Sequence, residues 1–269
     1  VETFSIEAMM GDKKALQAGT SHYLGQNFSK AFDVKFQDTD NTEKHVYATS
    51  WGVSTRLIGA LIMVHGDDKG LRLPPKIAPI QIVIVPIFKS DEDLDKLTQY
   101  VNPILEYMNE NNIPCYFDQR DKLSPGFKFN EWEMKGVPLR IEVGMRDLNN
   151  QALTIARRDN NEKSTIKINE SNTFLITTLD DIQESLFNEA LAFKKDNTFQ
   201  TSDYDEFKKM ISNGGFVECG WDGEDETESK IKKETNATIR CIPLEQKHNL
   251  KCIYTQKPAK YNVVFAKAY

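Results

Sequence analysis

The stretch that decides the fold of the first part of the chain is Ala48-Thr49-Ser50-Trp51-Gly52-Val53-Ser54-Thr55-Arg56-Leu57-Ile58-Gly59-Ala60, which ends a polar strand and starts an apolar run. Serine and threonine before the apolar residues suit a helix N-terminus, so the sequence predicts a strand, a turn and a helix from Ser54 to about His65. Arg56 stands at the turn, where its planar, permanently charged guanidinium suits phosphate, and the neighbouring glycine lets a ligand approach the backbone. Many α/β proteins contain this order of elements, so the stretch alone leaves both interpretations open.

Polar side chains are concentrated upstream, in Ala15-Leu16-Gln17-Ala18-Gly19-Thr20-Ser21-His22-Tyr23-Leu24-Gly25-Gln26-Asn27-Phe28. Glutamine, threonine, serine and histidine stand there beside two glycines, and a buried core would not tolerate so many donors unpaired. This density of donors favours a binding site over a plain strand–turn–helix unit.

Together these two stretches resemble the catalytic domain of the prolyl-tRNA synthetases, which are class II aminoacyl-tRNA synthetases. The run QAGTSHYLGQNF at 17–28 is similar to the proline-pocket strand and loop of the family, and SWGVSTR at 50–56 is similar to motif 3, which ends in the ATP-binding arginine. The resemblance continues at 73–79 (LPPKIAP), the link into the anticodon-binding domain, at 128–140 (KFNEWEMKGVPLR), and at 265–269 (FAKAY). It covers essentially the whole chain.

The composition is that of a protein with packed cores. The 269 residues are 39% hydrophobic and 28% charged, which excludes wholesale disorder, and this length favours two or three domains. No apolar run approaches the roughly 20 residues that a membrane span needs, and the first residues show no secretory signal. The four cysteines are scattered and do not indicate a disulfide framework. We therefore expect a cytoplasmic protein that has no membrane segment.

The net charge of −6 argues mildly against nucleic-acid binding, because phosphate contacts favour a basic surface. A local basic patch is nevertheless enough to read a few bases of a folded RNA. Basic residues gather in one part of the chain at Lys128, Lys135, Arg140, Arg146, Arg157 and Arg158. By composition alone, a solvated charged face is the preferred interpretation of this cluster.

Prolines at 74, 75 and 79 separate the first part of the chain from the rest. The β-branched run at 80–85 is typical of a strand buried on both faces, and the alternation of strands and helices after it predicts an α/β layer. A long helix from about Asp180 to Lys195 then leads into a more polar last block, with strands predicted at 216–219, 237–243 and 261–265. Burial in this block is expected at Phe216, Trp221, Ile239, Ile242 and Val264.

The predicted fold class is a multidomain mixture of α/β and α+β structure. With the resemblance, residues 1–73 correspond to the end of the class II antiparallel sheet, and residues 74–178 to an α/β anticodon-binding domain with a mixed sheet. Residues 179–269 correspond to a linker helix and a small α+β C-terminal domain that is similar to the zinc domain of some family members.

The resemblance implies the activity of a proline–tRNA ligase, which activates L-proline with ATP and Mg²⁺ and transfers it to tRNA(Pro). Such chemistry depends on positioning and charge neutralisation rather than on a nucleophilic triad. Carried over by position, the catalytic residues are Arg56, Gln17 and His22. The implied ATP contacts are Gln17, Thr20, Ser54 and Arg56, and the implied proline contacts are His22, Trp51 and Gly52. Without the resemblance, His22 would be assigned a structural role and Trp51 a place in a core.

The family also uses motif 1, which builds the dimer interface, and motif 2, whose arginine grips the α-phosphate of ATP. Both precede the QAGTSH segment in the family, and we expect this chain to lack them. The isolated polypeptide is therefore not expected to activate proline, and a homodimer is expected to form through the missing part.

The positions in the 128–146 region that match the family imply anticodon reading by Glu133, Arg140 and Arg146. Arginine presents two donors to a guanine edge, a carboxylate accepts from amino groups, and unstacked loop bases are the usual target of RNA readers. A salt-bridged pair of Glu133 and Arg140 is the alternative interpretation.

Some family members hold zinc with four cysteines in the C-terminal domain. Here Cys219 and Cys252 stand at two of those positions, whereas Glu224 and Tyr254 occupy the partner positions, and Cys241 matches a position that need not ligate. Structural zinc sites use four nitrogen or sulfur ligands. We therefore expect neither structural zinc nor another metal ligand set.

Two other interpretations remain open. One is a related class II synthetase for threonine, histidine or glycine, although the Gly-Thr-Ser-His loop and the Ala-Lys-Ala-Tyr terminus argue against it. The other is a non-catalytic tRNA- or RNA-binding module built on an anticodon-binding domain, against which the retention of Gln17, His22 and Arg56 argues.

Overall fold

The computed structural model describes residues 2–269, which form mixed α/β structure with both antiparallel and mixed sheets, as the sequence predicts. The chain divides into two compact units. The first unit contains the residues up to Val64 and those from Phe193 onward, and the second contains His65–Ala192. No helix of the described residues is both long and apolar enough to cross a membrane.

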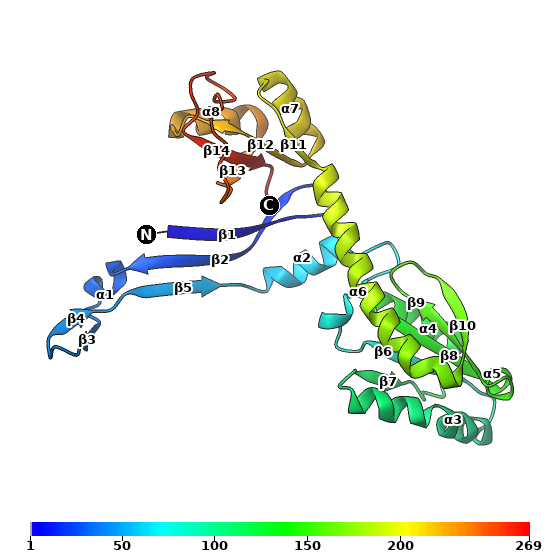
Figure 1. Ribbon diagram of the computed structural model, residues 1–269. Coiled ribbons are helices and arrows are strands. Elements are labelled where there is room, and N and C mark those ends of the chain that lie inside the picture. The colour runs from blue at the N-terminus through cyan, green and yellow to red at the C-terminus, as the bar shows by residue number, and fades with distance from the viewer. Residues whose placement is uncertain (1) are drawn as a thin grey trace. The chain divides into compact units, whose positions relative to one another are not determined.

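The first unit begins with a three-stranded antiparallel sheet in the order β1-β2-β5 (Figure 1). Its strands are β1 (Glu2–Met9), β2 (Ala15–Gly25) and β5 (Ala48–Gly52). Between β2 and β5 lie α1 (Asn27–Ala31), β3 (Lys35–Gln37) and β4 (Glu43–His45). After β5 comes the predicted helix, α2 (Arg56–His65), which begins at the arginine itself.

A four-stranded sheet in the order β11-β12-β14-β13 completes the first unit. Its strands are β11 (Thr198–Gln200), β12 (Phe216–Trp221), β13 (Thr238–Cys241) and β14 (Tyr261–Ala266). The helices α7 (Tyr204–Asn213) and α8 (Asp225–Thr235) pack on it around Phe207 and Ile231.

The predicted core of this block needs one correction. Phe216 is buried, and Trp221, Ile239 and Val264 are half-buried, but Ile242 lies beyond the end of β13 and is 47% exposed. Because Pro243 follows it directly and cannot donate to a sheet ladder, the pairing ends before Ile242 and its side chain turns to solvent.

The second unit is built on a five-stranded mixed sheet in the order β10-β9-β8-β6-β7. Its strands are β6 (Ile82–Ile87), β7 (Cys115–Phe117), β8 (Leu139–Gly144), β9 (Ala152–Arg157) and β10 (Lys163–Lys167). Its helices are α3 (Asp91–Glu110), α4 (Pro125–Met134), α5 (Met145–Asn149) and α6 (Ser171–Asp196), with short 3₁₀ turns at Pro75–Ile77 and Ile168–Glu170.

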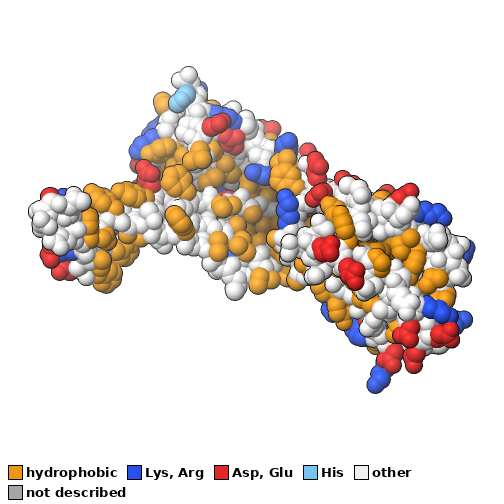
Figure 2. Space-filling model, turned by 60° about the horizontal axis from the view of Figure 1, so that its bottom comes forward, with side chains coloured by type: hydrophobic (Ala, Val, Ile, Leu, Met, Phe, Trp, Pro, Cys, Tyr) orange, Lys and Arg blue, Asp and Glu red, His pale blue; other side chains and the backbone are white. Residues whose placement is uncertain are grey.

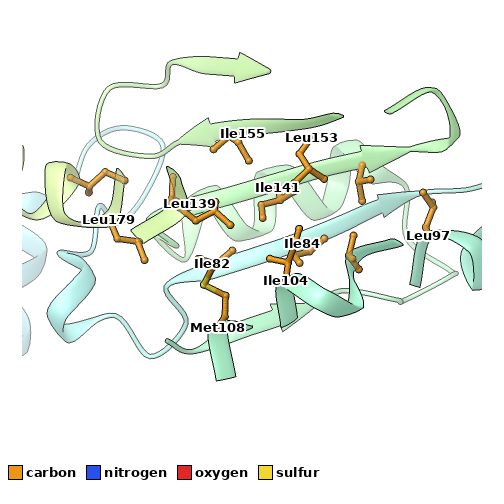
Figure 3. Close-up of a cluster of buried hydrophobic side chains, with 14 of the residues drawn as sticks. Ile82, Ile84, Leu97, Ile104, Met108, Leu139, Ile141, Leu153, Ile155 and Leu179 are labelled. Atoms are coloured by element: carbon orange, nitrogen blue, oxygen red, sulfur yellow. The ribbon is translucent and has the colours of Figure 1, made fainter. Parts of the chain in front are cut away.

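The main core of the second unit lies on the face of the sheet that α3 and α6 cover. Ile82, Ile84 and Ile141 are fully buried there, together with Leu97 of α3 and Leu179 of α6 (Figure 3). On the opposite face, α4 covers β6. The continuous apolar run of β6 is therefore buried on both sides, as the sequence predicts.

The linker helix is longer than predicted. It starts at Ser171 rather than near Asp180, and its residues Leu175, Leu179 and Leu186 all pack in the core of the second unit. The predicted boundary between residues 178 and 179 consequently lies inside α6. The division into 1–73, 74–178 and 179–269 stays a prediction.

Candidate functional site

Two groups of candidate residues are built by different units, and the first lies on the β1-β2-β5 sheet. Side chains alternate between the faces of a strand, so Thr20 and His22 of β2 share one face. His22 Nε2 lies 3.1 Å from Thr20 Oγ1, and His22 Nδ1 lies 2.9 Å from Oγ1 of Thr3 on β1. The two hydroxyls hold the imidazole ring in one orientation. Thr3 was not among the residues selected from the sequence.

Arg56 meets this face from the first turn of α2. Its Nη1 donates to the carbonyl oxygen of Gln17 at 3.2 Å, and its backbone N–H donates to Ser54 Oγ at 3.3 Å. The Gln17 side chain donates in turn to Glu7 Oε1 at 3.3 Å. Glu7 also accepts from the guanidinium of Arg240, at 3.0 and 3.1 Å. The structure thus brings the predicted residues Gln17, Ser54 and Arg56 together.

Trp51 lies on the other face of the same sheet. In the β2–β5 ladder, His22 is paired with Ser50, whereas Trp51 is paired with Ser21, so His22 and Trp51 point to opposite sides. Trp51 lines an apolar hollow of about 260 Å³ together with Phe4 and Ile6. The predicted proline contacts are therefore divided between two faces.

Gly52 is paired with Thr20, and a Cβ built on it would lie 3.8 Å from Thr20 Oγ1. It belongs to the face of His22. A side chain at this position would extend over Thr20, so glycine keeps the polar face open.

The second group of residues lies in the second unit, where Glu133 and Arg140 line one hollow of about 130 Å³. Arg140 donates to Glu142 Oε1 through Nε at 3.1 Å and through Nη2 at 2.9 Å, and its guanidinium lies 4.6 Å from the ring centroid of Phe129. Its contact with Glu133, at 4.0 Å, is longer than either hydrogen bond to Glu142. The salt-bridged pair of Glu133 and Arg140 is therefore a minor contact, and the carboxylate of Glu133 faces the hollow with Lys69.

Lys69 reaches this hollow because the chain before the sheet runs along the end of α4. Lys69 Nζ lies 3.2 Å from Glu133 Oε1. Gly136 has a positive φ of 74°, and a Cβ there would lie 2.6 Å from the Cβ of Leu71, so only glycine permits this approach. No local pattern could have shown this, because Lys69 and Glu133 are distant in the sequence.

Of the predicted basic cluster, Arg140, Arg157 and Arg158 line the hollow together with Lys163, which the sequence analysis missed. Lys128 does not: its side chain is 1% exposed and donates to the carbonyl oxygen of Asp118 at 3.0 Å. The predicted basic cluster therefore contains both a buried side chain, that of Lys128, and side chains that line the hollow.

Asp118 is the buried anchor beneath α4. Its carboxylate accepts from Trp132 Nε1 at 2.8 Å and from Arg120 at 2.8 and 2.7 Å. Burial by itself would raise the pKa of Asp118, but these hydrogen bonds and the charge of Lys128 lower it to about 2. The ion pair therefore stays charged at neutral pH and ties α4 to the segment after β7.

Arg146 does not join Glu133 and Arg140. It is exposed on α5 and lines a separate hollow with Thr165 and Lys167. The structure therefore brings two of the three predicted anticodon readers together and places the third elsewhere on the unit.

The positions that correspond to zinc ligands do not fit a metal. Within the described chain, 2–269, no group of three or more His, Cys, Asp or Glu residues is arranged to hold an ion. The Tyr254 hydroxyl is 3.2 Å from Glu234, and Glu224 precedes α8 with its N–H donated to Asp222. Cys219 and Cys252 are both buried, and burial raises the pKa of the Cys219 thiol to about 12.

Comparison with known families agrees with the fold of the second unit. Residues 81–178 match the family described as "Anticodon binding domain", and residues 204–269 match the family described as "Prolyl-tRNA synthetase, C-terminal". The mixed sheet with its basic hollow therefore matches a family of anticodon-binding domains, a type of domain that occurs in aminoacyl-tRNA synthetases.

Curated relatives extend the match to the whole chain. Proteins named "Proline--tRNA ligase" are 52% identical in Flavobacterium psychrophilum, 53% in Cytophaga hutchinsonii and 50% in Porphyromonas gingivalis, in each case over 100% of this chain and 55% of the relative. The chain thus spans about half the length of the curated relatives it matches. It belongs to the prolyl-tRNA synthetase family and corresponds to a C-terminal portion.

Proposed function

We propose that this chain is part of a proline–tRNA ligase, which activates L-proline with ATP and transfers the prolyl group to tRNA(Pro). The observation that carries the proposal is the convergence of Arg56, Gln17 and Ser54 at the edge of the β1-β2-β5 sheet. These residues come from the two stretches that resemble the proline-pocket and motif 3 segments of the family. The identity over the whole chain supports the same activity.

The geometry suits adenylate formation. Arg56 would bind the ATP phosphates and offset their charge, with Mg²⁺ accompanying ATP as substrate, while Gln17, Thr20 and Ser54 would contact the nucleotide. His22, held by two hydroxyls, would contact proline or its carboxylate, and Gly52 would leave room beside it. Because Trp51 lies on the other face, its proposed contact with proline is the weakest of the set.

Anticodon reading is assigned to the hollow of the second unit. Glu133 offers carboxylate oxygens and Arg140 offers N–H donors on a base-sized concave surface, which is the chemistry that reads a guanine edge. The guanidinium of Arg140 lies over the ring of Phe129, which limits its movement. Arg146 would contact the same RNA from its separate position.

Exposed apolar side chains on the first unit support the proposal that further polypeptide covers it in the complete protein. Figure 2 shows such side chains gathered on the segment with α1, β3 and β4. Phe32 is 74% exposed and Tyr47 is 69% exposed. Patches of this kind mark interaction surfaces. A homodimer and a cytoplasmic location complete the proposal.

The test is proline-dependent ATP–pyrophosphate exchange and tRNA charging by the full-length protein that contains this chain. Wild-type protein should catalyse both, and Arg140→Ala or Glu133→Gln should weaken charging while exchange stays nearly intact. If the full-length protein binds tRNA(Pro) but shows no exchange with proline, the alternative of a non-catalytic RNA-binding module is correct. Loss of both activities in the Arg140 variant would mean that this residue holds the fold rather than reads bases.

A further inference from the structure

The face of the five-stranded sheet that carries Arg140 continues beyond the hollow of Glu133 and Arg140. α4 covers β6 on this face, with Trp132 packed on Val83 and Val85. Beyond α4, residues of β8, β9 and β10 that are paired across the strands form a row on this same face of the sheet. Glu142 is paired with Thr154, which is paired with Thr165. Along this row Glu142 is buried, Thr154 is half-buried and Thr165 is exposed, and the row leads from the first hollow towards α5.

A second, larger hollow lies at the far end of the same face. It measures about 570 Å³ and is lined by residues of α5, β9 and β10. Its polar side chains include those of Arg146, Asn150, Thr154, Thr165 and Lys167. Since Thr154 and Thr165 stand in the row beside Glu142, the two hollows share one continuous surface.

The charge of this second hollow is positive. Among the described residues, 2–269, Arg146 is the one arginine whose guanidinium takes part in neither an ion pair nor a hydrogen bond. Lys167 Nζ donates to the carbonyl oxygen of Asn150 at 3.1 Å and has no carboxylate partner among those residues. The acid that lines the hollow is Asp147, and its carboxylate accepts the Gly144 N–H at 2.8 Å.

The surface between the two hollows carries no uncompensated carboxylate among its named residues that would repel an anion. Glu142 is 8% exposed, and its carboxylate is neutralised by Arg140 at 2.9 Å and by Lys163 at 2.8 Å. Beyond it, the hydroxyls of Thr154 and Thr165 can donate to phosphate or ribose oxygens. From Arg140 to Gly144 the strand rises about 13 Å, which exceeds the length of one nucleotide.

We propose that the hollow of Arg146 and Lys167 is a phosphate-backbone site for the same single RNA strand whose bases enter the hollow of Glu133 and Arg140. The inference rests on the proposed function and deepens it. The guanidinium and the ammonium bind a phosphodiester, and Thr165 donates to it from the β10 edge. These interactions fix the register of the strand but carry no base preference, whereas Arg140 and Glu133 discriminate between bases.

The experiment measures binding of tRNA(Pro) to the full-length protein over a range of salt concentrations. Removal of both cations, in Arg146→Ala with Lys167→Ala, should weaken binding roughly tenfold. The plot of log K against log salt should become shallower by about 0.7 for each phosphate that the variant no longer neutralises. Anticodon-base substitutions in the tRNA should still weaken binding by the same factor as in wild type. Thr165→Ala should weaken binding less than the double substitution does.

The matched control is Lys96→Ala, because Lys96 lies on α3, on the other side of the sheet, where it pairs with Glu92. This control should retain wild-type affinity and salt slope, and thermal unfolding should verify that every variant is folded. If the double variant keeps wild-type affinity and slope while Arg140→Ala weakens binding, the phosphate site is wrong and the proposed function stands. If Arg140→Ala also leaves binding unchanged, anticodon reading in this unit fails.

Free phosphate shares the chemistry of the RNA backbone, so a competition arm separates the two sources. Inorganic phosphate, added at constant ionic strength, should not displace tRNA(Pro) at concentrations below those of the supporting salt. Binding of phosphate that depends on Arg146 and Lys167, with tRNA affinity unchanged in the double variant, would assign the hollow to a small anion and overturn the proposal.

Discussion

The two sheets that carry the candidate sites differ in how far their apolar side chains are buried by packed helices. The five-stranded sheet buries Ile82, Ile84 and Ile141 fully, because α3 and α6 pack on the face that carries them. The β1-β2-β5 sheet leaves Ile6 67% exposed and Trp51 79% exposed, and α2 buries only Ala60. Apolar side chains on β-strands thus form a closed core in one region and an exposed apolar face in the other.

The difference in burial between the two sheets matches what the two proposed sites require. The anticodon reading that we propose needs a polar surface on a packed sheet, and the five-stranded sheet provides one within residues 65–192. A nucleotide site requires a water-poor environment, in which charges act strongly. The open sheet supplies the proposed catalytic side chains, and its exposed apolar face fits our proposal that additional protein surface completes it.

The largest effect is expected from a matched pair of isoleucine substitutions. Ile141→Ala in the closed core should lower the free energy of unfolding by about 2–5 kcal/mol, because it opens a cavity in packed surroundings. Ile6→Ala on the open sheet should change it by less than about 0.5 kcal/mol, since this side chain is largely in solvent. Denaturant unfolding of the 269-residue chain measures both. Equal losses at the two sites would contradict the comparison.

The next effect separates the two regions by activity. Arg56→Ala in the full-length protein should cost on the order of 2–4 kcal/mol of transition-state stabilisation and lower proline-dependent exchange at least about a hundredfold. Binding of tRNA(Pro) should be unaffected, because we propose that its bases are read in the other unit. Lys30→Ala, an exposed cation on α1, is the control. Near-normal exchange in the Arg56 variant would remove this residue from the site.

A pH-dependent effect should be specific to the closed region. The folded-state pKa of Asp118, about 2, lies below its usual 3.8, so the carboxylate stabilises the fold above about pH 4, and this contribution is lost as the pH falls towards 2. At pH 7, Asp118→Asn should cost about 1.5–3 kcal/mol. The gap between wild type and variant should narrow on acidification. Exposed Asp95→Asn should show no such trend; a gap that is constant with pH would refute this role.

The smallest effect concerns the C-terminus, which returns to the open sheet. The Ala15 N–H donates to the carbonyl oxygen of Lys267 at 2.8 Å, and desolvation and a hydrogen bond with Asp12 raise the pKa of Tyr269 to about 12. Deletion of residues 267–269 should reduce exchange severalfold and leave the unfolding midpoint nearly unchanged. Unaltered exchange would mean that the terminus has no part in the site.

Elemental analysis of the same purified protein tests the metal prediction. We expect no stoichiometric zinc, because Cys219 and Cys252 lack two further ligands. Stoichiometric zinc would show that the C-terminal block closes around a metal in a way that its hydrogen bonds do not suggest.

The sequence predicts the elements well where the local pattern is strong. The β-branched run at 80–85 is such a local signal, and the structure places the strand β6 there, buried on both faces. Local signals fail at Ile242, which looks like a strand residue but lies past the last pairing. They also fail at the start of α6, where burial against the sheet extends the helix.

The sequence by itself determined the elements, the family and the residue types that suit phosphate and RNA, because these depend on composition and spacing along the chain. Only the tertiary structure decided that His22 and Trp51 face opposite ways, that Arg146 stands apart from Arg140, and that Lys128 is interior. The physical reason is that strand register decides to which face of a sheet a side chain points. Whether a charged side chain is buried or exposed depends in the same way on the partners that it contacts. Register and partners come from pairings between distant residues, which a local pattern does not encode.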